Sequence, residues 1–275
     1  MGRHRQVASE TADREVFGSN GLKSGLRSVS RALDILETLA ASEKELSLTE
    51  ISIATGLHAS TASRFIVALV ERGYLSRNAT SGHFSLGMAT LRLGAKARSQ
   101  LSWLLDTARP LLQRLASDTQ ETAILALLDR DAAVTVDLVE SPWAVRVTSY
   151  VGERIPLYCT GAGKALLAYL PHSRAQKLIK SISFRAFTDS TILDAHQLEE
   201  DLESVRRKGY SVNDEEYEAG ERSAAAPVFA PGEIVVAALA LSGPTVRVTR
   251  ETLDEFGLIV KNAASEVSRQ LGAGR

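Results

Sequence analysis

Apolar residues recur at helical spacing in three short segments near the N-terminus. The first segment follows Ser28, a residue type favoured at helix N-caps, and its apolar positions are Val29, Leu33, Leu36 and Ala40. A second helix is predicted from Ser47, because Ser47 and Glu50 have the spacing of a capping box. A third helix is predicted after the break at Gly56, with the apolar positions Ala62, Phe65, Ile66, Leu69 and Val70. Two helices joined by a short glycine turn and preceded by another are typical of a helix-turn-helix.

The segment after the third helix predicts a β-wing. Gly73 ends the helix, residues 74–77 and 83–86 have strand character, and residues 78–82 are rich in turn formers. From Met88 to Leu105 the pattern is helical again, so we expect a linker helix over 88–105. Residues 1–25 lack periodicity and predict a disordered tail.

The rest of the chain, residues 106–275, mixes strands and helices. Strands are predicted over 122–128, 133–140, 145–150, 210–213, 224–229 and 234–242. Helices are predicted around Leu111, from Gly161, through Ala175, from Asp194 and from Arg250. A sheet with helices on its faces makes this segment an α+β domain of the kind found in sensors.

Length and charge support a division into two domains, of which the first is suited to nucleic acid. A chain of 275 residues exceeds the usual size of one domain. The net charge of −1 hides an asymmetry, because residues 1–95 carry 11 Lys and Arg against 9 Asp and Glu. Between His58 and Arg92 the only acid is Glu71, against the arginines Arg64, Arg72, Arg77 and Arg92. Such a local excess of positive charge suits phosphate contacts.

Composition also excludes several classes of protein. No apolar run approaches the roughly 20 residues that a membrane span needs, and the N-terminus has no apolar stretch typical of a secretory signal. We therefore expect a cytoplasmic protein without membrane contact. The single cysteine, Cys159, permits no internal disulfide and no thiolate metal site, so neither a metal nor a cofactor is expected.

Candidates for DNA contact lie at the start of the third helix. Ser60, Thr61 and Ser63 offer hydroxyls to phosphates or base edges, and Arg64 can form two hydrogen bonds with guanine. The alternative is that Ser60 and Thr61 only cap the helix and that Arg64 is only solvated. Further contacts to phosphates or to the minor groove are predicted for Ser28, Arg31, Arg77 and His83.

Little in the chain indicates catalysis. The run Thr160-Gly-Ala-Gly-Lys164 resembles a nucleotide-binding P-loop only in part. A P-loop needs a glycine at position 158 and a Ser or Thr after the lysine, and this chain has Tyr158 and Ala165 there. The amides of Gly161 and Ala162 still favour an anion such as a carboxylate, unless the glycines serve chain reversal alone. A nucleophilic role for Cys159 stays open as part of an enzyme alternative. The acidic runs 199–201 and 214–216 are expected on solvated faces.

Motifs of both domains resemble the IclR family of regulators. In the first domain they are Ser28-Val-x-Arg31-Ala-Leu-x-Ile35-Leu, Thr55-Gly-Leu, Ser60-Thr61-x-x-Arg64, Gly73-Tyr-Leu75 and Phe84-Ser-Leu-Gly87. In the second they are Thr160-Gly-Ala-Gly-Lys164, Asp214-Glu-Glu216, Ala225-Ala-Pro227-Val and Ser242-Gly-Pro244. The resemblance covers about residues 26–271. It implies a winged helix-turn-helix DNA-binding domain (26–87), a linker helix (88–105) and a GAF-like effector-binding domain (106–275), in homodimers that pair into tetramers.

The resemblance also implies where an effector binds. The family's polar contacts fall at or beside Asn213, Asp214, Ser223 and Ser242, next to the turn of Gly161 and Ala162. Apolar walls are expected from Leu125, Trp143, Val145 and Tyr150, although Trp143 and Tyr150 equally suit a core. The chain departs from the family pattern twice, with Ser223 in place of the usual cysteine and Tyr158 in place of the usual histidine.

These features predict a ligand-responsive repressor or activator that binds double-stranded operator DNA. Its operator binding is expected to change with a small organic effector, either a carboxylate or an aromatic molecule, and its target is expected to be an adjacent catabolic operon. Two alternatives remain open. One is a hydrolase or transferase with an N-terminal interaction module, and the other is an architectural protein that binds DNA constitutively.

Overall fold

The computed structural model describes residues 19–274, and the chain divides between Ser99 and Gln100 into two compact units. The elements of the first unit are α1 (Ser19–Ala40), α2 (Leu48–Thr55), α3 (Ala59–Glu71), β1 (Leu75–Arg77), β2 (Phe84–Leu86) and α4 (Met88–Ser99). The elements of the second unit are α5 (Ser102–Thr119), β3 (Thr122–Asp129), β4 (Ala132–Val139), β5 (Arg154–Pro156), α6 (Gly161–Ala168), α7 (His172–Ser181), α8 (Ala195–Lys208), β6 (Ser211–Asp214), β7 (Glu221–Ala230), β8 (Ile234–Pro244) and α9 (Arg250–Gln270).

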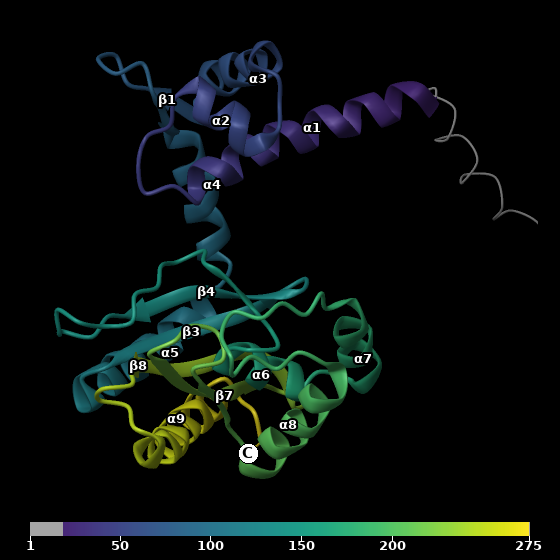
Figure 1. The fold of residues 1–275 in the computed structure, drawn as a ribbon. Coiled ribbons are helices and arrows are strands. Elements are labelled where there is room, and N and C mark those ends of the chain that lie inside the picture. The colour runs from purple at the N-terminus through teal and green to yellow at the C-terminus, as the bar shows by residue number, and fades with distance from the viewer. Residues whose placement is uncertain (1–18, 275) are drawn as a thin grey trace, which may run out of the picture. The chain divides into compact units, whose positions relative to one another are not determined.

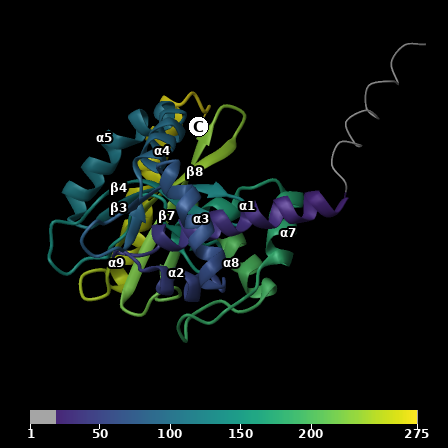
Figure 2. The ribbon, with the colours of Figure 1, turned by 90° about the horizontal axis from the view of Figure 1, so that it is seen from above.

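The first unit is a three-helix core with a wing (Figures 1 and 2). Its helices α1, α2 and α3 pack around the buried side chains Ile35, Leu39, Leu46, Ile51, Ile66 and Leu75. The predicted capping box is confirmed, since the Ser47 hydroxyl accepts the Glu50 amide at 3.2 Å and the Glu50 carboxylate accepts the Ser47 amide at 2.8 Å. Gly56 then turns the chain in the left-handed region, with φ of 65°. This arrangement is a helix-turn-helix.

The predicted wing is also confirmed. The strands β1 and β2 pair antiparallel, with Leu75 opposite Leu86. Leu46, just before α2, exchanges backbone hydrogen bonds of 2.8 and 3.0 Å with Phe84. The Asn78 side chain donates to the Glu45 carboxylate, and its carbonyl oxygen accepts the amides of Thr80 and Ser81. These contacts join the turn of the wing to the helical core.

Two predicted boundaries in this region are wrong. The helix α1 begins at Ser19, so Ser28 lies inside the helix and is not its N-cap, and residues 19–25 are not part of a tail. Residues 1–18 lie outside the described residues. The predicted single helix over 88–105 is interrupted at Gln100 and Leu101, and α5 starts where Leu104 and Leu105 become buried. The helix α1 can extend through Ser28 because serine is only mildly unfavourable within a helix. The start of α5 is decided by packing of its apolar residues in the core of the second unit.

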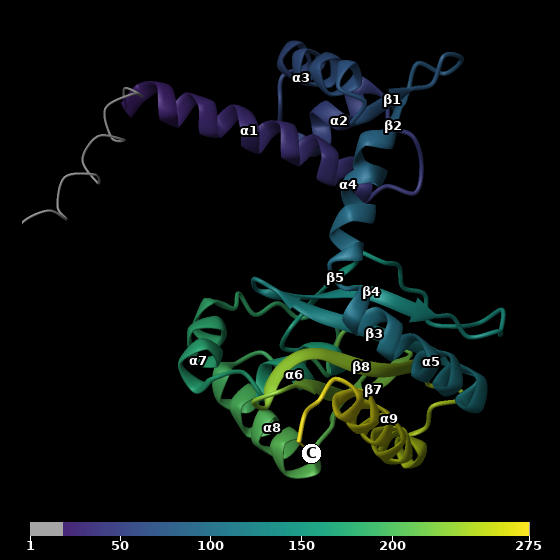
Figure 3. The same cartoon turned by 180° about the vertical axis from the view of Figure 1, so that it is seen from behind.

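The second unit is an antiparallel sheet of six strands in the order β5-β4-β3-β8-β7-β6, with helices on both faces. The helices α5 and α9 cover one face, and α6, α7 and α8 lie on the other (Figures 1 and 3). Because side chains alternate along a strand, neighbouring residues join different cores. Leu125 packs in the core beneath α5 and α9, whereas Ile124 packs in the core beneath α6 and α8.

The predicted strand over 145–150 is absent. The edge strand β5 lies later in the chain and pairs with the start of β4, with Ala133 opposite Ile155. The backbone of Thr135 bonds instead to Gly152 and Glu153, at 2.8 and 3.0 Å. Residues 145–150 therefore form an irregular segment beside the sheet, because the hydrogen bonds that this part of β4 offers are taken by the residues after it.

Candidate nucleic-acid interface and ligand cavity

The helix α3 presents a polar face whose four candidate side chains form no hydrogen bond or ion pair with the described residues. Its buried side chains are Ala62 and Ile66. Ser60 and Arg64 are exposed, and Thr61 and Ser63 are half-buried. None of these four side chains makes a hydrogen bond or ion pair with another described residue. His58 is the N-cap, so Ser60 and Thr61 lie within the first turn and are not needed as caps.

The same face contains an apolar residue that sequence reasoning missed. Val67 is 53% exposed and lies one turn beyond Ser63 and Arg64. Val67 is not among the apolar positions that predicted this helix, and the packing shows that its side chain points outward. An exposed valine on such a face suits contact with a thymine methyl group.

The wing brings an arginine close to this face. Ser63 of α3 and Arg77 of β1 line one hollow of about 350 Å³, together with Val67 and Phe84. Arg77 donates to the carbonyl of Gly82 at 3.4 Å, and its guanidinium lies 5.9 Å from the centre of the Phe84 ring. The remaining candidates are dispersed. His83 is half-buried on the wing, and Ser28 and Arg31 are exposed on α1.

A cavity of about 70 Å³ lies in the second unit, between the start of α6 and the sheet. Four of the expected effector contacts line it, namely Gly161, Ala162, Ser223 and Ser242. The last two lie opposite each other on β7 and β8. The Thr160 hydroxyl caps α6 by accepting the Gly163 amide at 3.1 Å. The amides of Gly161 and Ala162 thus belong to the first turn of α6, whose N–H groups have no acceptor within the helix.

The cavity also contains three carboxylates that sequence reasoning missed. Glu153, Glu218 and Glu221 line it together with the phenol of Tyr217. Burial raises the pKa of Glu221, and the carboxylates of Glu218 and Glu153 raise it further, while the hydrogen bond from Ser242 opposes the shift. Glu218 and Glu221 lie three residues apart at the turn into β7, where the Glu221 amide donates to the Glu218 carbonyl at 3.2 Å, but Glu153 precedes β5 and no spacing connects it with them in the sequence.

Strand register keeps two expected contacts, Leu125 and Asp214, away from the cavity, and burial keeps away a third, Asn213. Leu125 is opposite Leu239 and belongs to the other face of the sheet. Asp214 is opposite Arg222, one step out of phase with Ser223. Asn213 lies on the correct face but is fully buried, where its side chain donates to the Ser223 hydroxyl at 3.3 Å and accepts the Glu216 amide at 2.8 Å. Asn213 therefore supports the cavity wall indirectly, by its hydrogen bond to the lining residue Ser223.

The two aromatic candidates are on the surface. Trp143 is 50% exposed, and the guanidinium of Arg247 lies 5.9 Å from the centre of its ring. Tyr150 is 56% exposed, and Val145 is exposed as well. None of the three lines the cavity, whereas Val147, Thr148 and Ser149 of the same segment do. The segment therefore supplies a wall, although with other side chains.

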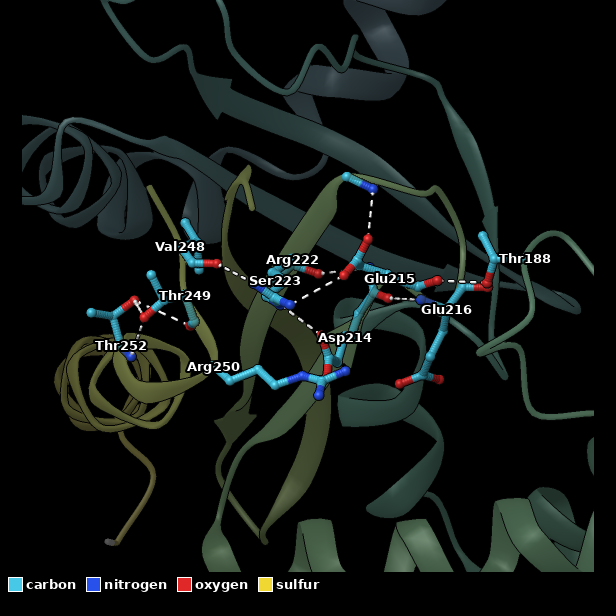
Figure 4. A network of polar contacts seen from close by, with 12 residues as sticks. Thr188, Asp214, Glu215, Glu216, Arg222, Ser223, Val248, Thr249, Arg250 and Thr252 are labelled. Carbon is cyan, nitrogen blue, oxygen red and sulfur yellow. Dashed lines mark hydrogen bonds and ion pairs between the residues drawn. The ribbon is translucent and has the colours of Figure 1, made fainter. Parts of the chain in front are cut away.

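An ion-pair network holds the first residues of β7 in place (Figure 4). Arg222 donates to Asp214 at 2.6 Å, to Glu215 at 3.1 Å and to the carbonyl of Val248 at 2.9 Å. Arg250 donates to the second oxygen of Asp214 at 2.8 Å. Since neighbouring side chains of a strand point to opposite faces, anchoring Arg222 directs Glu221 and Ser223 toward the cavity.

The acidic runs are not simply solvated. Glu216 is buried and forms an ion pair with Lys164 at 2.6 Å, and Asp201 lies 3.0 Å from the same ammonium. Lys164 is only 1% exposed, so its charge depends on these partners. Burial raises the pKa of Glu216, and the ammonium of Lys164 opposes that shift. The lysine of the glycine turn is thus a structural residue.

The environment of Cys159 makes its thiol unsuited to act as a nucleophile. Cys159 is fully buried, and burial, followed by the charge of Glu216, raises the pKa of its thiol to about 12. Tyr158 is also buried, and its hydroxyl bonds the backbone of Arg185 at 2.8 and 3.0 Å. Neither residue lines the cavity.

Two further tests apply to residues 19–274. No group of three or more His, Cys, Asp or Glu side chains in this range is placed to hold a metal ion. In the same range no single helix has the length and apolar character of a membrane span, and α2 and α3 meet those criteria only as a pair bent by 111°.

Comparison with known proteins matches both units. Residues 28–79 match the IclR helix-turn-helix domain, and residues 100–269 match the C-terminal domain of bacterial transcriptional regulator IclR. The transcriptional repressor IclR of Escherichia coli is 32% identical over 91% of this chain and 92% of its own length. The acetate operon repressor of Salmonella typhimurium is 31% identical over the same shares. The crystal structure of an IclR regulator from Alicyclobacillus acidocaldarius covers 90% of this chain and 99% of its own, with 28% identity and a TM-score of 0.76.

The fold, the unpaired face of α3 and these matches define a DNA-binding transcription regulator with a ligand-binding domain. The chain belongs to the IclR family of bacterial transcriptional regulators. The expected fold, a winged helix-turn-helix followed by a GAF-like α+β domain, is confirmed. The two relatives named above are repressors, which supports a regulator over the enzyme alternative.

Proposed function

We propose that α3 enters the major groove of operator DNA and contacts it through Ser60, Thr61, Ser63 and Arg64. The observation that supports this assignment is the lack of internal partners for all four side chains, on a helix whose opposite face forms the core. Polar groups left unpaired at a helix start suit phosphates and base edges. The additional contacts, to phosphates or to the minor groove, come from Arg77 and His83 on the wing and from Ser28 and Arg31 on α1.

Arg64→Ala tests this interface, and Arg207→Ala is the matched control, because Arg207 is an exposed arginine in the second unit. The full chain first selects a duplex from a random library, and fluorescence anisotropy then measures the affinity of each variant over a range of salt. We expect Arg64→Ala to cost about 1–3 kcal/mol and to relax one base position if it contacts guanine, or to lower the salt slope by about 1 if it contacts phosphate. Unchanged affinity and slope would contradict the assignment.

We propose that the chain acts as a homodimer, with pairs of dimers forming tetramers. An apolar stripe on α1 supports a second copy as the occupant, since Leu26, Val29 and Leu33 have helical spacing and are 67%, 60% and 50% exposed. A dimer would place two α3 helices in successive major grooves, about 34 Å apart. Leu33→Asp is expected to yield monomers in light scattering and to weaken operator binding, and a variant that stays dimeric would exclude α1 as the interface.

We propose that the cavity at α6 binds a small organic effector whose binding changes operator affinity. The support is the set of polar groups that converge there, the amides of Gly161 and Ala162 and the hydroxyls of Ser223 and Ser242. An effector changes operator affinity if it binds more tightly to one of two conformations of the protein. The shift in the equilibrium between the conformations is limited by the difference between the effector's affinities for them. A thermal-shift screen of small metabolites followed by anisotropy with the selected duplex tests this coupling. The architectural alternative predicts that no ligand raises the melting temperature.

We propose that the target is a neighbouring catabolic operon, regulated in the cytoplasm. The support is one relative of similar length, which is a repressor of the acetate operon. Transcript levels of adjacent genes, compared between a deletion strain and its parent, test the proposal and also distinguish a repressor from an activator. If the transcript levels of the adjacent genes are the same in both strains, with and without the compound that the operon degrades, the proposed target is wrong.

A further inference from the structure

The cavity at α6 has an unbalanced charge. Its acidic lining residues are Glu153, Glu218 and Glu221, and its lining includes no Lys, Arg or His among the residues that the structure describes. The other polar groups that line it are neutral, and the apolar walls include Ile124, Ile155 and Ala240. A ligand that enters this space therefore meets three carboxylates and no fixed cation.

The cations on adjoining segments are engaged elsewhere. Arg146, next to the wall residue Val147, pairs with Glu140 at 3.4 Å. Arg154, next to Glu153, pairs with Asp129 and with Asp131. Arg222, next to Glu221, is held by Asp214 and Glu215, and Lys164 of α6 is held by Glu216 and Asp201. These pairs leave the cavity carboxylates without a positive partner from the neighbouring chain.

The carboxylate of Glu221 is already half-satisfied by a neutral donor. The Ser242 hydroxyl donates to its Oε1 atom, and the Ser149 hydroxyl donates to Oε2 of Glu153 at 2.6 Å. Glu221 and Glu153 thus each have one carboxylate oxygen bound to a serine and a second oxygen available to a ligand. No cation contributes to the raised pKa of Glu221, which results from burial and from the charges of Glu218 and Glu153. Close carboxylates without a counter-ion favour a cation in the space between them.

We propose that the effector of this regulator carries a protonated nitrogen, which binds between the carboxylates of Glu153, Glu218 and Glu221. The inference rests on the proposed effector function of the cavity and specifies the ligand's chemistry. A simple carboxylate fits poorly, because the carboxylates of Glu153, Glu218 and Glu221 would repel its negative charge. A carboxylate on the same molecule as the nitrogen remains compatible, since the amides of Gly161 and Ala162 lie on the cavity wall as well.

The volume restricts the ligand to a small molecule. A cavity of about 70 Å³ accommodates on the order of five non-hydrogen atoms, given the 10–15 Å³ that one water needs. Butylamine, β-alanine, butyrate and 1-butanol form a size-matched set that differs in charge. Isothermal titration calorimetry of the full chain with each of the four at neutral pH measures the preference directly.

We expect butylamine or β-alanine to bind at least about tenfold more tightly than butyrate and 1-butanol. Glu221→Gln is expected to weaken binding of the amine about tenfold, because it removes one charge and keeps the acceptor for Ser242. Glu203→Gln, at an exposed position of α8, is the matched control and should leave binding unchanged. Tighter binding of butyrate, equal loss in both variants, or no amine binding at all overturns the proposal.

Operator binding separates this inference from the proposed function. If the amines bind and Glu221→Gln weakens them, but anisotropy with the selected duplex is unaffected, the ligand class is correct and the coupling to DNA is wrong. If butyrate changes operator affinity and the amines do not, the coupling is correct and the ligand class is wrong.

Discussion

Ser242 on β8 donates a hydrogen bond to the carboxylate of Glu221 on β7, although the two residues are diagonal neighbours in the sheet. The residue opposite Ser242 is Ser223, and the residue opposite Glu221 is Pro244. A long side chain can reach such a diagonal neighbour. The contact turns Glu221 over the cavity and connects its charge state to the fold and to ligand binding.

Glu221→Gln is expected to stabilise the ligand-free protein at neutral pH. The folded protein holds a proton on Glu221 to higher pH than the unfolded chain does, because burial and the nearby Glu218 and Glu153 raise its pKa above 4.5. The free energy of unfolding of the parent therefore falls as the pH rises from 4.5 through the raised pKa of Glu221 in the folded protein. Glutamine does not titrate, so the variant keeps this free energy. We expect a melting temperature higher by about 2–4 °C at neutral pH, with no difference below about pH 4. A variant less stable than the parent at neutral pH would contradict the assigned environment.

Lys164→Met should be strongly destabilising. It leaves the buried carboxylate of Glu216 without its ion-pair partner, which typically costs about 3–5 kcal/mol. The double variant Lys164→Met with Glu216→Gln removes the buried charge as well and should recover part of the loss. Urea unfolding of the three proteins measures the effect, and a single variant within about 1 kcal/mol of the parent would show that the pair is not needed.

Gly257→Ala and Gly94→Ala form a matched pair of helix substitutions. A Cβ atom at Gly257 in α9 would lie 2.2 Å from Cε2 of Tyr210, whereas a Cβ at Gly94 in α4 meets nothing within 4 Å. The first change should cost about 1–3 kcal/mol through overpacking, and the second should be neutral or stabilise by up to about 1 kcal/mol. Calorimetric unfolding compares them, and equal effects would argue against close packing of α9 on Tyr210.

Asn78→Ala should weaken DNA binding without unfolding the protein. Asn78 holds the turn of the wing through the Glu45 carboxylate and the amides of Thr80 and Ser81, so its loss frees Arg77 to sample other positions. We expect a several-fold loss of affinity that is similar for all sequences, as is typical of backbone contacts. Thr80→Ala is the control on the same turn, because no side-chain bond of Thr80 to another described residue accompanies its amide contact. Equal losses in both variants would indicate that the turn, and not Asn78, matters.

The elements with strong local signals were predictable. The capping box of Ser47 and Glu50, the turn at Gly56 and the helices led by Thr160 and Asp194 depend on hydrogen bonds within a few residues of each other. The polar start of α3 was predictable for the same reason, since helical spacing alone separates Ser60 and Arg64 from Ala62 and Ile66.

The cavity was predicted only where a motif marked it. Gly161, Ala162, Ser223 and Ser242 line it as expected, whereas strand register places Leu125 and Asp214 on the other phase of the sheet. A shift of one residue along a strand reverses the face, and that register depends on which strands pair. The irregular segment at 145–150 illustrates the same dependence, because β4 pairs with residues that follow it.

The sequence alone determined that a DNA-binding helix-turn-helix domain precedes an α+β domain. The helix caps, turns and apolar spacings that indicate these domains depend on interactions between residues close together in the chain. The charge of the cavity was decided by tertiary structure alone. Glu153 precedes β5, whereas Glu218 and Glu221 lie together at the turn into β7, and only the folded sheet brings these two distant segments to one space. Electrostatic interactions act through space, so the repulsion among these acids exists only once the chain has folded.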